Sequence, residues 1–239
     1  MEIKDLCKKL RLAYIPDVYE EVVFQDKQQY LKELLKQEIE QRERQKIKKN
    51  IKKAGFISKK FLNDYEWNSG IHMPKSIDID DLQNLGFIDR KENLICIGAP
   101  GTGKSHLVSA LGIKACQSGY EARFFRVYDL VQKLEKLWEI RKLESFKKSI
   151  SKVSVIILDE MGYIPFSKKG SELLFQFVTD WYETKTVMIT SNLEFSQWNK
   201  IFIDPRLTAA LVDRLIHHAH IISFTGKSYR VEHALSKRK

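Results

Sequence analysis

Short apolar runs alternate with longer amphipathic stretches over the C-terminal two thirds of the chain. Residues 93–98, 122–127, 153–159, 186–190 and 220–224 predict five strands. The stretches between them, roughly residues 104–118, 129–150, 170–184 and 207–217, have the longer period of helices. Strands that are apolar throughout and alternate with helices indicate a parallel sheet covered on both faces. We therefore predict an α/β domain with a five-stranded parallel sheet, whose ligands bind at the carboxyl ends of the strands.

The first part of the chain has a different pattern. Apolar residues from Leu31 to Ile51 mostly suit one face of a single helix, and Gly55 is a plausible end for it. Residues 66–78 (EWNSGIHMPKSID) combine Asn, Ser, Gly and Pro, which is typical of a linker. The predicted organisation is a small helical domain over residues 1–65, a linker over 66–78, and the α/β domain over 79–239.

Positive charge is concentrated in one short segment. The chain carries a net charge of +10, and residues 42–60 hold nine basic residues and one acid, a net +8 that leaves +2 for the rest. Such a patch favours a polyanionic partner, most often nucleic acid, although a solvated helix face has the same composition. The candidate DNA-binding residues are Arg42, Arg44, Lys46, Lys48, Lys49, Lys52 and Lys53.

Cysteine usage and hydropathy indicate a soluble, cytoplasmic protein. Cys7, Cys96 and Cys116 are odd in number and far apart in sequence, which favours reduced thiols and offers no metal-ligand spacing. The N-terminal segment lacks the apolar run of a signal peptide, and no stretch approaches the ~20 apolar residues of a membrane span.

The first predicted strand leads directly into the motif GAPGTGKSH. Gly98, Gly103, Lys104 and Ser105 fit the pattern G-x-x-x-x-G-K-[ST] between a strand and a helix. Its glycines let backbone N–H groups approach phosphate oxygens, while Lys104 would reach the β- and γ-phosphates and Ser105 would bind Mg²⁺. The candidate nucleotide-binding residues are Gly98, Pro100, Gly101, Thr102, Gly103, Lys104, Ser105 and His106.

Polar side chains end two further strands. Asp159 and Glu160 follow the apolar run VSVIIL, where carboxylates are costly unless a cation or a reacting water uses them. We expect Asp159 to hold Mg²⁺ and Glu160 to act as general base in ATP hydrolysis, the alternative being two solvated acids. Asn192 follows the next strand and could contact the γ-phosphate and the attacking water, or could be an ordinary turn residue.

The chain resembles a known family in these motifs and in two longer stretches. GAPGTGKSH, LDEMGYIPFSKKGSELLFQ, VMITSNLEFSQW and DRLIHHAH together are similar to the IstB-like ATPases, over about residues 90–232. These are AAA+ transposition helpers of bacterial insertion sequences, related to DnaC-type helicase loaders. The resemblance implies an AAA+ P-loop sheet, ATP with Mg²⁺, and ATP-dependent rings or helical filaments on double-stranded DNA. It also implies a transposase partner.

The resemblance assigns roles to three more side chains. It makes Asn192 a sensor of the γ-phosphate, Arg214 a catalytic residue that reaches ATP bound by the neighbouring subunit, and Arg230 a second sensor. A full C-terminal helical lid is not expected, because Lys239 follows Arg230 closely. From the residues alone, Arg214 shares a helix side with leucines and needs an anionic partner, which an internal salt bridge could equally supply.

Three histidines, His217, His218 and His220, lie close together in sequence. His217 and His218 are adjacent and would face different directions on a helix, and no acid cluster nearby completes a ligand set. We therefore expect no metal site at these histidines.

The leading hypothesis is an ATPase that oligomerises on DNA and regulates target selection and transposase activity. The alternative is a DnaC-type loader of a replicative helicase. A DNA-binding architectural protein with a purely structural nucleotide clamp is a third possibility. A small-molecule kinase is disfavoured, because the Asp-Glu pair points to hydrolysis.

Overall fold

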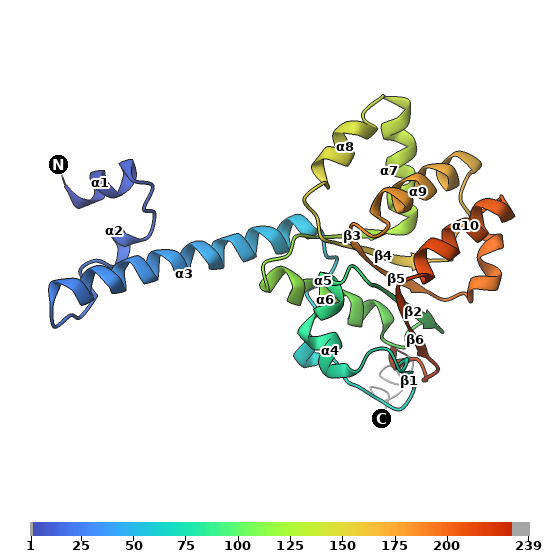
Figure 1. Cartoon of the computed structure of the whole chain (residues 1–239), viewed down its shortest axis with the longest axis horizontal. Helices are drawn as coiled ribbons and strands as arrows, with labels where there is room; N and C mark the ends of the chain where they lie inside the picture. The colour runs from blue at the N-terminus through green and yellow to red at the C-terminus, as the bar shows by residue number, and fades with distance from the viewer. Residues whose placement is uncertain (1, 231–239) are drawn as a thin grey trace. The chain divides into compact units, whose positions relative to one another are not determined.

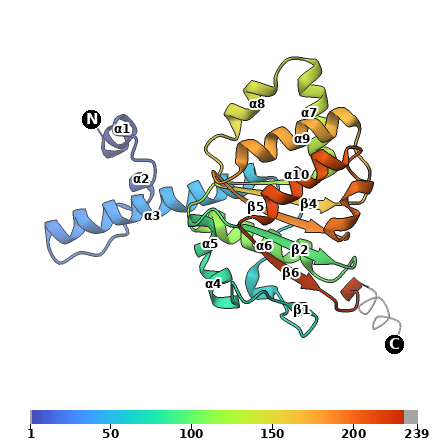
Figure 2. The same ribbon diagram turned by 45° about the vertical axis from the view of Figure 1, so that its right-hand side comes forward.

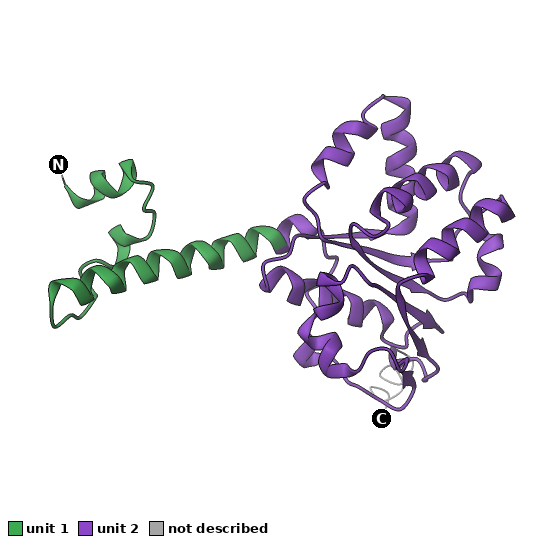
Figure 3. Cartoon of the chain, in the orientation of Figure 1, with its two compact units in different colours: residues 1–50 green, residues 51–239 purple. Residues whose placement is uncertain are grey.

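The computed structural model describes residues 2–230. Their contacts divide the chain into two compact units, residues 1–50 and 51–239 (Figure 3). The linker predicted over residues 66–78 lies within the second unit instead of between two domains. The difference arises because residues 51–78 add side chains to the core of the second unit, among them Ala54, Tyr65 and Ile77.

The first unit is helical. It contains α1 (Ile3–Lys9), α2 (Ile15–Val18) and most of α3 (Lys27–Ala54), which runs on past the boundary. Its small core is formed by Cys7, Ile15, Val22 and Leu34. A core of this size leaves most of α3 exposed, including the basic side chains of its C-terminal half.

The second unit is built on a mixed sheet of six strands in the order β1-β6-β2-β5-β4-β3 (Figures 1 and 2). The strands are β1 (Ile71–His72), β2 (Asn93–Gly98), β3 (Ala122–Arg126), β4 (Val155–Met161), β5 (Thr186–Ser191) and β6 (Ala219–Phe224). The five predicted strands, β2 to β6, are all present and mutually parallel. The sixth, β1, pairs antiparallel with β6 and lies within the segment predicted as a linker.

The helices alternate with the strands as predicted, with one interruption. They are α4 (Ile79–Asn84), α5 (Gly86–Asp89), α6 (Lys104–Gln117), α7 (Val127–Glu139), α8 (Leu143–Ser149), α9 (Lys168–Trp181) and α10 (Pro205–Ile216), with 3₁₀ turns at Leu62–Asp64 and Phe195–Lys200. The single helix predicted over residues 129–150 is divided into α7 and α8, because Arg141 adopts a left-handed φ of 55°. No helix among residues 2–230 is long and apolar enough to cross a membrane.

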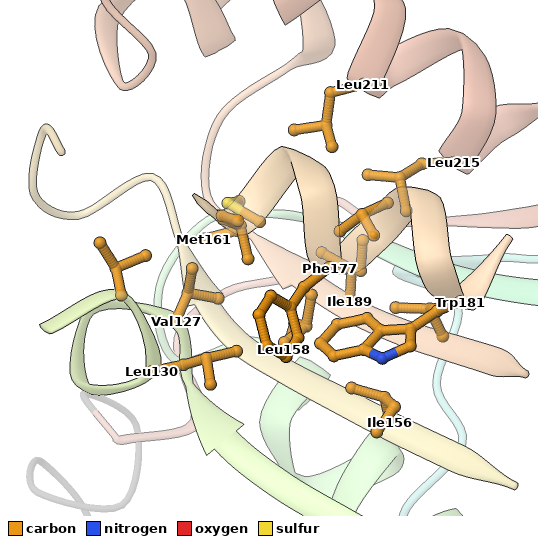
Figure 4. Packing of buried hydrophobic residues seen from close by; sticks show 14 of the residues in the cluster. Val127, Leu130, Ile156, Leu158, Met161, Phe177, Trp181, Ile189, Leu211 and Leu215 are labelled. Carbon is orange, nitrogen blue, oxygen red and sulfur yellow. The ribbon is translucent and has the colours of Figure 1, made fainter. Parts of the chain in front are cut away.

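Helices cover the sheet on both faces (Figures 1 and 2). In β4, Ile156 and Leu158 join the core cluster that contains residues of α7, α9 and α10, while Val155 and Ile157 join the cluster that contains residues of α6. Figure 4 shows the first of these clusters, with the α9 rings packed near the β4 side chains. Apolar side chains alternate between two covered faces of the sheet, which explains why the strands are mostly hydrophobic.

Candidate nucleotide site

The loop between β2 and α6 has the backbone that phosphate binding requires. Gly98 and Gly101 have φ values of 149° and 83°, which side chains rarely tolerate. A Cβ on Gly98 would also collide with the carbonyl oxygen of Phe224 in β6. The Tyr229 N–H donates to the Gly101 carbonyl at 3.0 Å, so the segment after β6 packs on the loop. The loop is therefore fixed from both the sheet and the segment that follows it.

Lys104 is held inside this loop. Its ammonium donates to the carbonyl oxygens of Gly98 at 2.6 Å and Ala99 at 2.7 Å, and the residue is only 7% exposed. Burial lowers the pKa of Lys104 from its ordinary value. A buried ammonium bound only by neutral carbonyls is well placed to gain from an anionic ligand.

Ser105 in α6 and Asp159 in β4 bring two side-chain oxygens together beside the loop. The Ser105 hydroxyl donates to Asp159 Oδ1 at 2.7 Å, and the Thr190 hydroxyl of β5 donates to the same oxygen at 2.5 Å. Asp159 is 4% exposed, and no Lys or Arg of residues 2–230 pairs with it. A buried carboxylate bound by hydroxyls but no cation fits a hard divalent ion, so these residues suit Mg²⁺.

Glu160 lies at a distortion of β4, and its carboxylate contacts a different group from that of Asp159. It has a left-handed φ of 64°, and the pairing of β4 with β5 shifts register between Leu158 and Met161. The Glu160 N–H donates to the Thr190 hydroxyl at 3.0 Å, and its carboxylate lies 3.5 Å from Arg126 Nε. Such bulges re-aim side chains near active sites. The carboxylates of Asp159 and Glu160 therefore have different partners: the first contacts Ser105 and Thr190, and the second contacts Arg126.

Asn192 follows β5 at the edge of the same site. Its Oδ1 is buried and has no hydrogen-bond partner within the described part of the chain. An unsatisfied buried amide oxygen is costly, and such atoms in native proteins commonly await a ligand or water.

These residues line a cleft of about 590 Å³. The predicted residues in its wall are Pro100, Gly101, Thr102, Gly103, Lys104, Ser105, His106, Asp159, Glu160, Asn192 and Arg230. Gly98 is not in the wall; it contributes the carbonyl that holds Lys104. Ten residues that were predicted to bind phosphate, to bind metal or to act in catalysis therefore line one cleft, together with Arg230.

Several groups in the same wall are not predicted by the sequence motifs. Residues 57–68 contribute one side, and Tyr65 packs edge-to-face on His106 with ring centroids 5.2 Å apart. The Tyr65 hydroxyl and His106 Nε2 are buried without partners in residues 2–230. Burial lowers the pKa of His106, so its imidazole is neutral at pH 7. Thr190 and Arg126 were not predicted either, and the roles of Tyr65, Thr190 and Arg126 all depend on contacts between segments distant in sequence.

Arg214 lies outside the cleft. Its Nη1 donates to the Ala210 carbonyl of its own helix at 3.0 Å, and its guanidinium lies 4.9 Å from the ring centre of Phe175 in α9. No carboxylate in residues 2–230 forms an ion pair with it. The alternative of an internal salt bridge therefore finds no partner among the described residues, and the role of Arg214 across a subunit interface stays a prediction.

All seven predicted DNA-binding residues are exposed positions of α3. Arg42 differs from the rest, because its Nε pairs with Glu38 at 2.8 Å and its Nη2 donates to the Arg11 carbonyl. No ion pair joins the other six to any residue of the described range. These six side chains are therefore more available than Arg42 to bind a polyanion.

The chain matches the family model described as "IstB-like ATP binding protein" over residues 7–237. It belongs to this family. A protein named for ATP binding in insertion sequence IS232 of Bacillus thuringiensis is 33% identical over 209 residues, covering 87% of this chain and 82% of its own. Its counterpart in insertion sequence IS5376 of Geobacillus stearothermophilus is 35% identical over 206 residues, covering 85% and 80%. The resemblance inferred from the sequence is thereby confirmed.

Solved structures confirm the AAA+ fold of this IstB-like chain. The DnaC helicase loader matches with a TM-score of 0.55 at 20% identity, covering 70% of this chain and 96% of the loader. AMPPCP-bound DnaA from Aquifex aeolicus also matches with a TM-score of 0.55, at 16% identity, covering 75% and 54%. At these identities the likeness concerns the fold alone.

Proposed function

We propose that this IstB-like protein is an ATPase that assembles on double-stranded DNA and assists a transposase. The proposed ATPase activity rests on the hydrogen bonds of Thr190, whose hydroxyl contacts both the Asp159 carboxylate and the backbone N–H of Glu160. One hydroxyl thus orients a metal ligand and a candidate general base beneath the phosphate loop.

Each residue of the cleft has a distinct part in the proposed reaction. Lys104 leaves its loop carbonyls to bind the β- and γ-phosphates, while Ser105 and Asp159 hold Mg²⁺, which neutralises charge on the phosphate oxygens when bound. Glu160 accepts a proton from the attacking water, and Asn192 uses its free Oδ1 to orient that water. Arg230 lines the same cleft and adds positive charge near Lys104.

The aromatic wall of the cleft suits the nucleotide base. Tyr65 lies against Gly103 of the phosphate loop, and its unpaired hydroxyl and the neutral His106 Nε2 offer hydrogen-bonding groups beside apolar ring surface. A site of this kind combines apolar contact with a few polar groups that select the base. We assign the adenine to this wall.

Arg214 completes the site from a neighbouring subunit in this proposal. It has a guanidinium without a carboxylate partner in the described chain and lies outside its own cleft. A head-to-tail contact would place it at the γ-phosphate of the next protomer, and repeated contacts of this type generate rings or helical filaments. ATP would then drive assembly, and hydrolysis would reverse it.

The exposed basic residues of α3 support the proposed binding to DNA. Contacts between lysines and phosphates are independent of sequence and strongly sensitive to salt. The names of the relatives refer to insertion sequences, which favours a transposase as partner over the alternative, a replicative helicase.

A steady-state ATPase assay with and without duplex DNA tests the proposal, with Glu160→Gln as the inactive variant. We expect Mg²⁺-dependent hydrolysis that DNA alters, and at least a hundredfold loss of kcat in Glu160→Gln with ATP binding retained. Hydrolysis that survives this substitution would refute the role of Glu160. Electron microscopy with DNA and a non-hydrolysable ATP analogue tests assembly, and capture of a helicase instead of the transposase would support the alternative partner.

A further inference from the structure

The structure brings His217 and His218 together, contrary to the expectation from sequence. α10 ends at Ile216, so His218 lies in the connection to β6 and not on the helix. The two imidazole rings have centroids 4.1 Å apart. Adjacent residues face different directions on a continuous helix, but α10 ends before His217. In the turn that follows, the two rings approach each other.

A carboxylate completes the group from another part of the chain. Glu183 follows α9, and its Oε1 lies 3.6 Å from His218 Nε2. One ligand atom from each of Glu183, His217 and His218 lies within 4.8 Å of the others, and all three side chains are exposed. Glu183 adopts a left-handed φ of 57° just after the end of α9, which turns the chain toward the histidines.

From this geometry we propose a binding site for a divalent transition-metal ion of the zinc class at Glu183, His217 and His218. Two imidazoles and one carboxylate are a ligand set that zinc accepts, whereas magnesium and calcium prefer oxygen ligands. Ligand atoms around a tetrahedral zinc ion lie about 3.4 Å apart, given bond lengths near 2.1 Å. The pair of His218 and Glu183 is already close to this spacing, so small side-chain rotations would close the site.

Tyr182 supports the site from outside the ligand set. Its hydroxyl lies 2.7 Å from His217 Nδ1. When Nδ1 donates its proton to the phenolic oxygen, Nε2 keeps a free lone pair for the metal. Metal-binding histidines are commonly oriented by such a partner at the second ring nitrogen. Three protein ligands leave the fourth position of the ion to water or to a group from another molecule.

The test is titration of the full-length chain, free of any histidine tag, with Zn²⁺ followed by isothermal calorimetry. An excess of Mg²⁺ in the buffer occupies the oxygen site at Ser105 and Asp159 without competing for imidazoles. We expect one Zn²⁺ per chain in the wild type and at least a tenfold loss of affinity in His218→Ala and in Glu183→Gln. Tyr182→Phe should weaken binding by about tenfold, the size typical of an outer-shell contact.

His72→Ala is the matched control, because it removes an exposed imidazole that contacts Thr225 instead. It should bind Zn²⁺ like the wild type. Thermal melting followed by circular dichroism shows whether each variant is folded, and all substitutions lie at exposed or half-exposed positions. Absence of saturable Zn²⁺ binding to the wild type, or equal affinity in His218→Ala, would overturn the proposal. The cluster would then be an ordinary polar contact.

Discussion

Thr190 provides the sharpest test of how the cleft is built. Its hydroxyl donates to Asp159 Oδ1 at 2.5 Å and accepts from the Glu160 N–H at 3.0 Å, and the residue is 2% exposed. Thr190→Val keeps the shape and volume of the side chain but removes both hydrogen bonds. The substitution therefore changes polar contacts with little change in packing.

The expected magnitude follows from the two lost bonds. A hydrogen bond to a charged acceptor contributes about 1.5–3 kcal/mol, and leaving the partly buried Glu160 N–H unpaired adds about 1 kcal/mol. We expect Thr190→Val to lower the free energy of unfolding by about 2–4 kcal/mol. About 1.4 kcal/mol corresponds to a tenfold change in rate. If half of the lost energy, about 1–2 kcal/mol, holds Asp159 and Glu160 in their productive positions, kcat should fall by about five- to thirtyfold.

Steady-state ATPase kinetics against Mg²⁺ concentration separate this role from simple destabilisation. A positioning role predicts a lower kcat and a higher Mg²⁺ requirement at temperatures where circular dichroism shows a folded protein. Thr190→Ser is the control, because it keeps the hydroxyl and should retain most of the activity. If Thr190→Val hydrolysed ATP with the kcat and Mg²⁺ dependence of the wild type, the hydroxyl would not position the carboxylates.

Three further outcomes follow from the proposed mechanism. Lys104→Ala should lose ATP binding, measured with a fluorescent analogue, and with it ATP-dependent assembly on DNA; unchanged assembly would contradict the coupling. Arg214→Ala should bind ATP without hydrolysing it, and an equal mixture with Glu160→Gln should restore about one quarter of the interfaces, because each site draws on two subunits. Replacing Lys48 and Lys49 with Gln should reduce the slope of log affinity against log salt by up to about 1.8, at about 0.9 per phosphate contact, with little change in sequence preference.

Local patterns were sufficient to predict the sheet and the phosphate loop. The five parallel strands are mostly apolar, and the motif G-x-x-x-x-G-K-S predicts a loop between a strand and a helix. β1 could not be predicted in this way. It has only two residues, and its strand geometry depends on pairing Ile71 with Phe224, more than 150 positions later.

The cleft residues that were not predicted escaped prediction for the same reason: their roles depend on contacts with distant segments. Thr190 reads as one more β-branched residue of an apolar strand, and its contact with Asp159 spans 31 positions. Tyr65 directly precedes the predicted linker and ends the segment predicted as a helical domain. The sequence predicts no metal site at the histidines, because adjacent residues diverge on a helix and no acid cluster lies near them in sequence. Sequence patterns identify side chains near regular elements, while these roles arise from contacts between segments distant in sequence.

Glu38 allows a prediction for the helical unit that is independent of ATP. The buried carboxylate accepts the backbone N–H groups of Ala13, Tyr14 and Ile15 at 2.7–3.1 Å and pairs with Arg42 at 2.8 Å. Burial by itself would raise the pKa of Glu38, but these donors outweigh it and lower the pKa below the ordinary value of 4.5. The ionised carboxylate therefore stabilises the connection between α1 and α2.

The sign of the pH dependence follows from that lowered pKa. The stabilisation is fully present above pH 4.5, the ordinary pKa, and is lost as the pH falls through the lower pKa of the folded state. Hydrogen exchange of the amides of Ala13, Tyr14 and Ile15, corrected for intrinsic rates, should show constant protection from pH 7 to pH 5 and a decline below it. Glu38→Gln should reduce this protection at neutral pH by at least tenfold, since a bond to a charged acceptor contributes about 1.5–3 kcal/mol. Glu40→Gln, at an exposed position of the same helix, should change nothing. Protection that persists in Glu38→Gln would mean that packing of the small apolar core, and not the carboxylate, holds this connection in place.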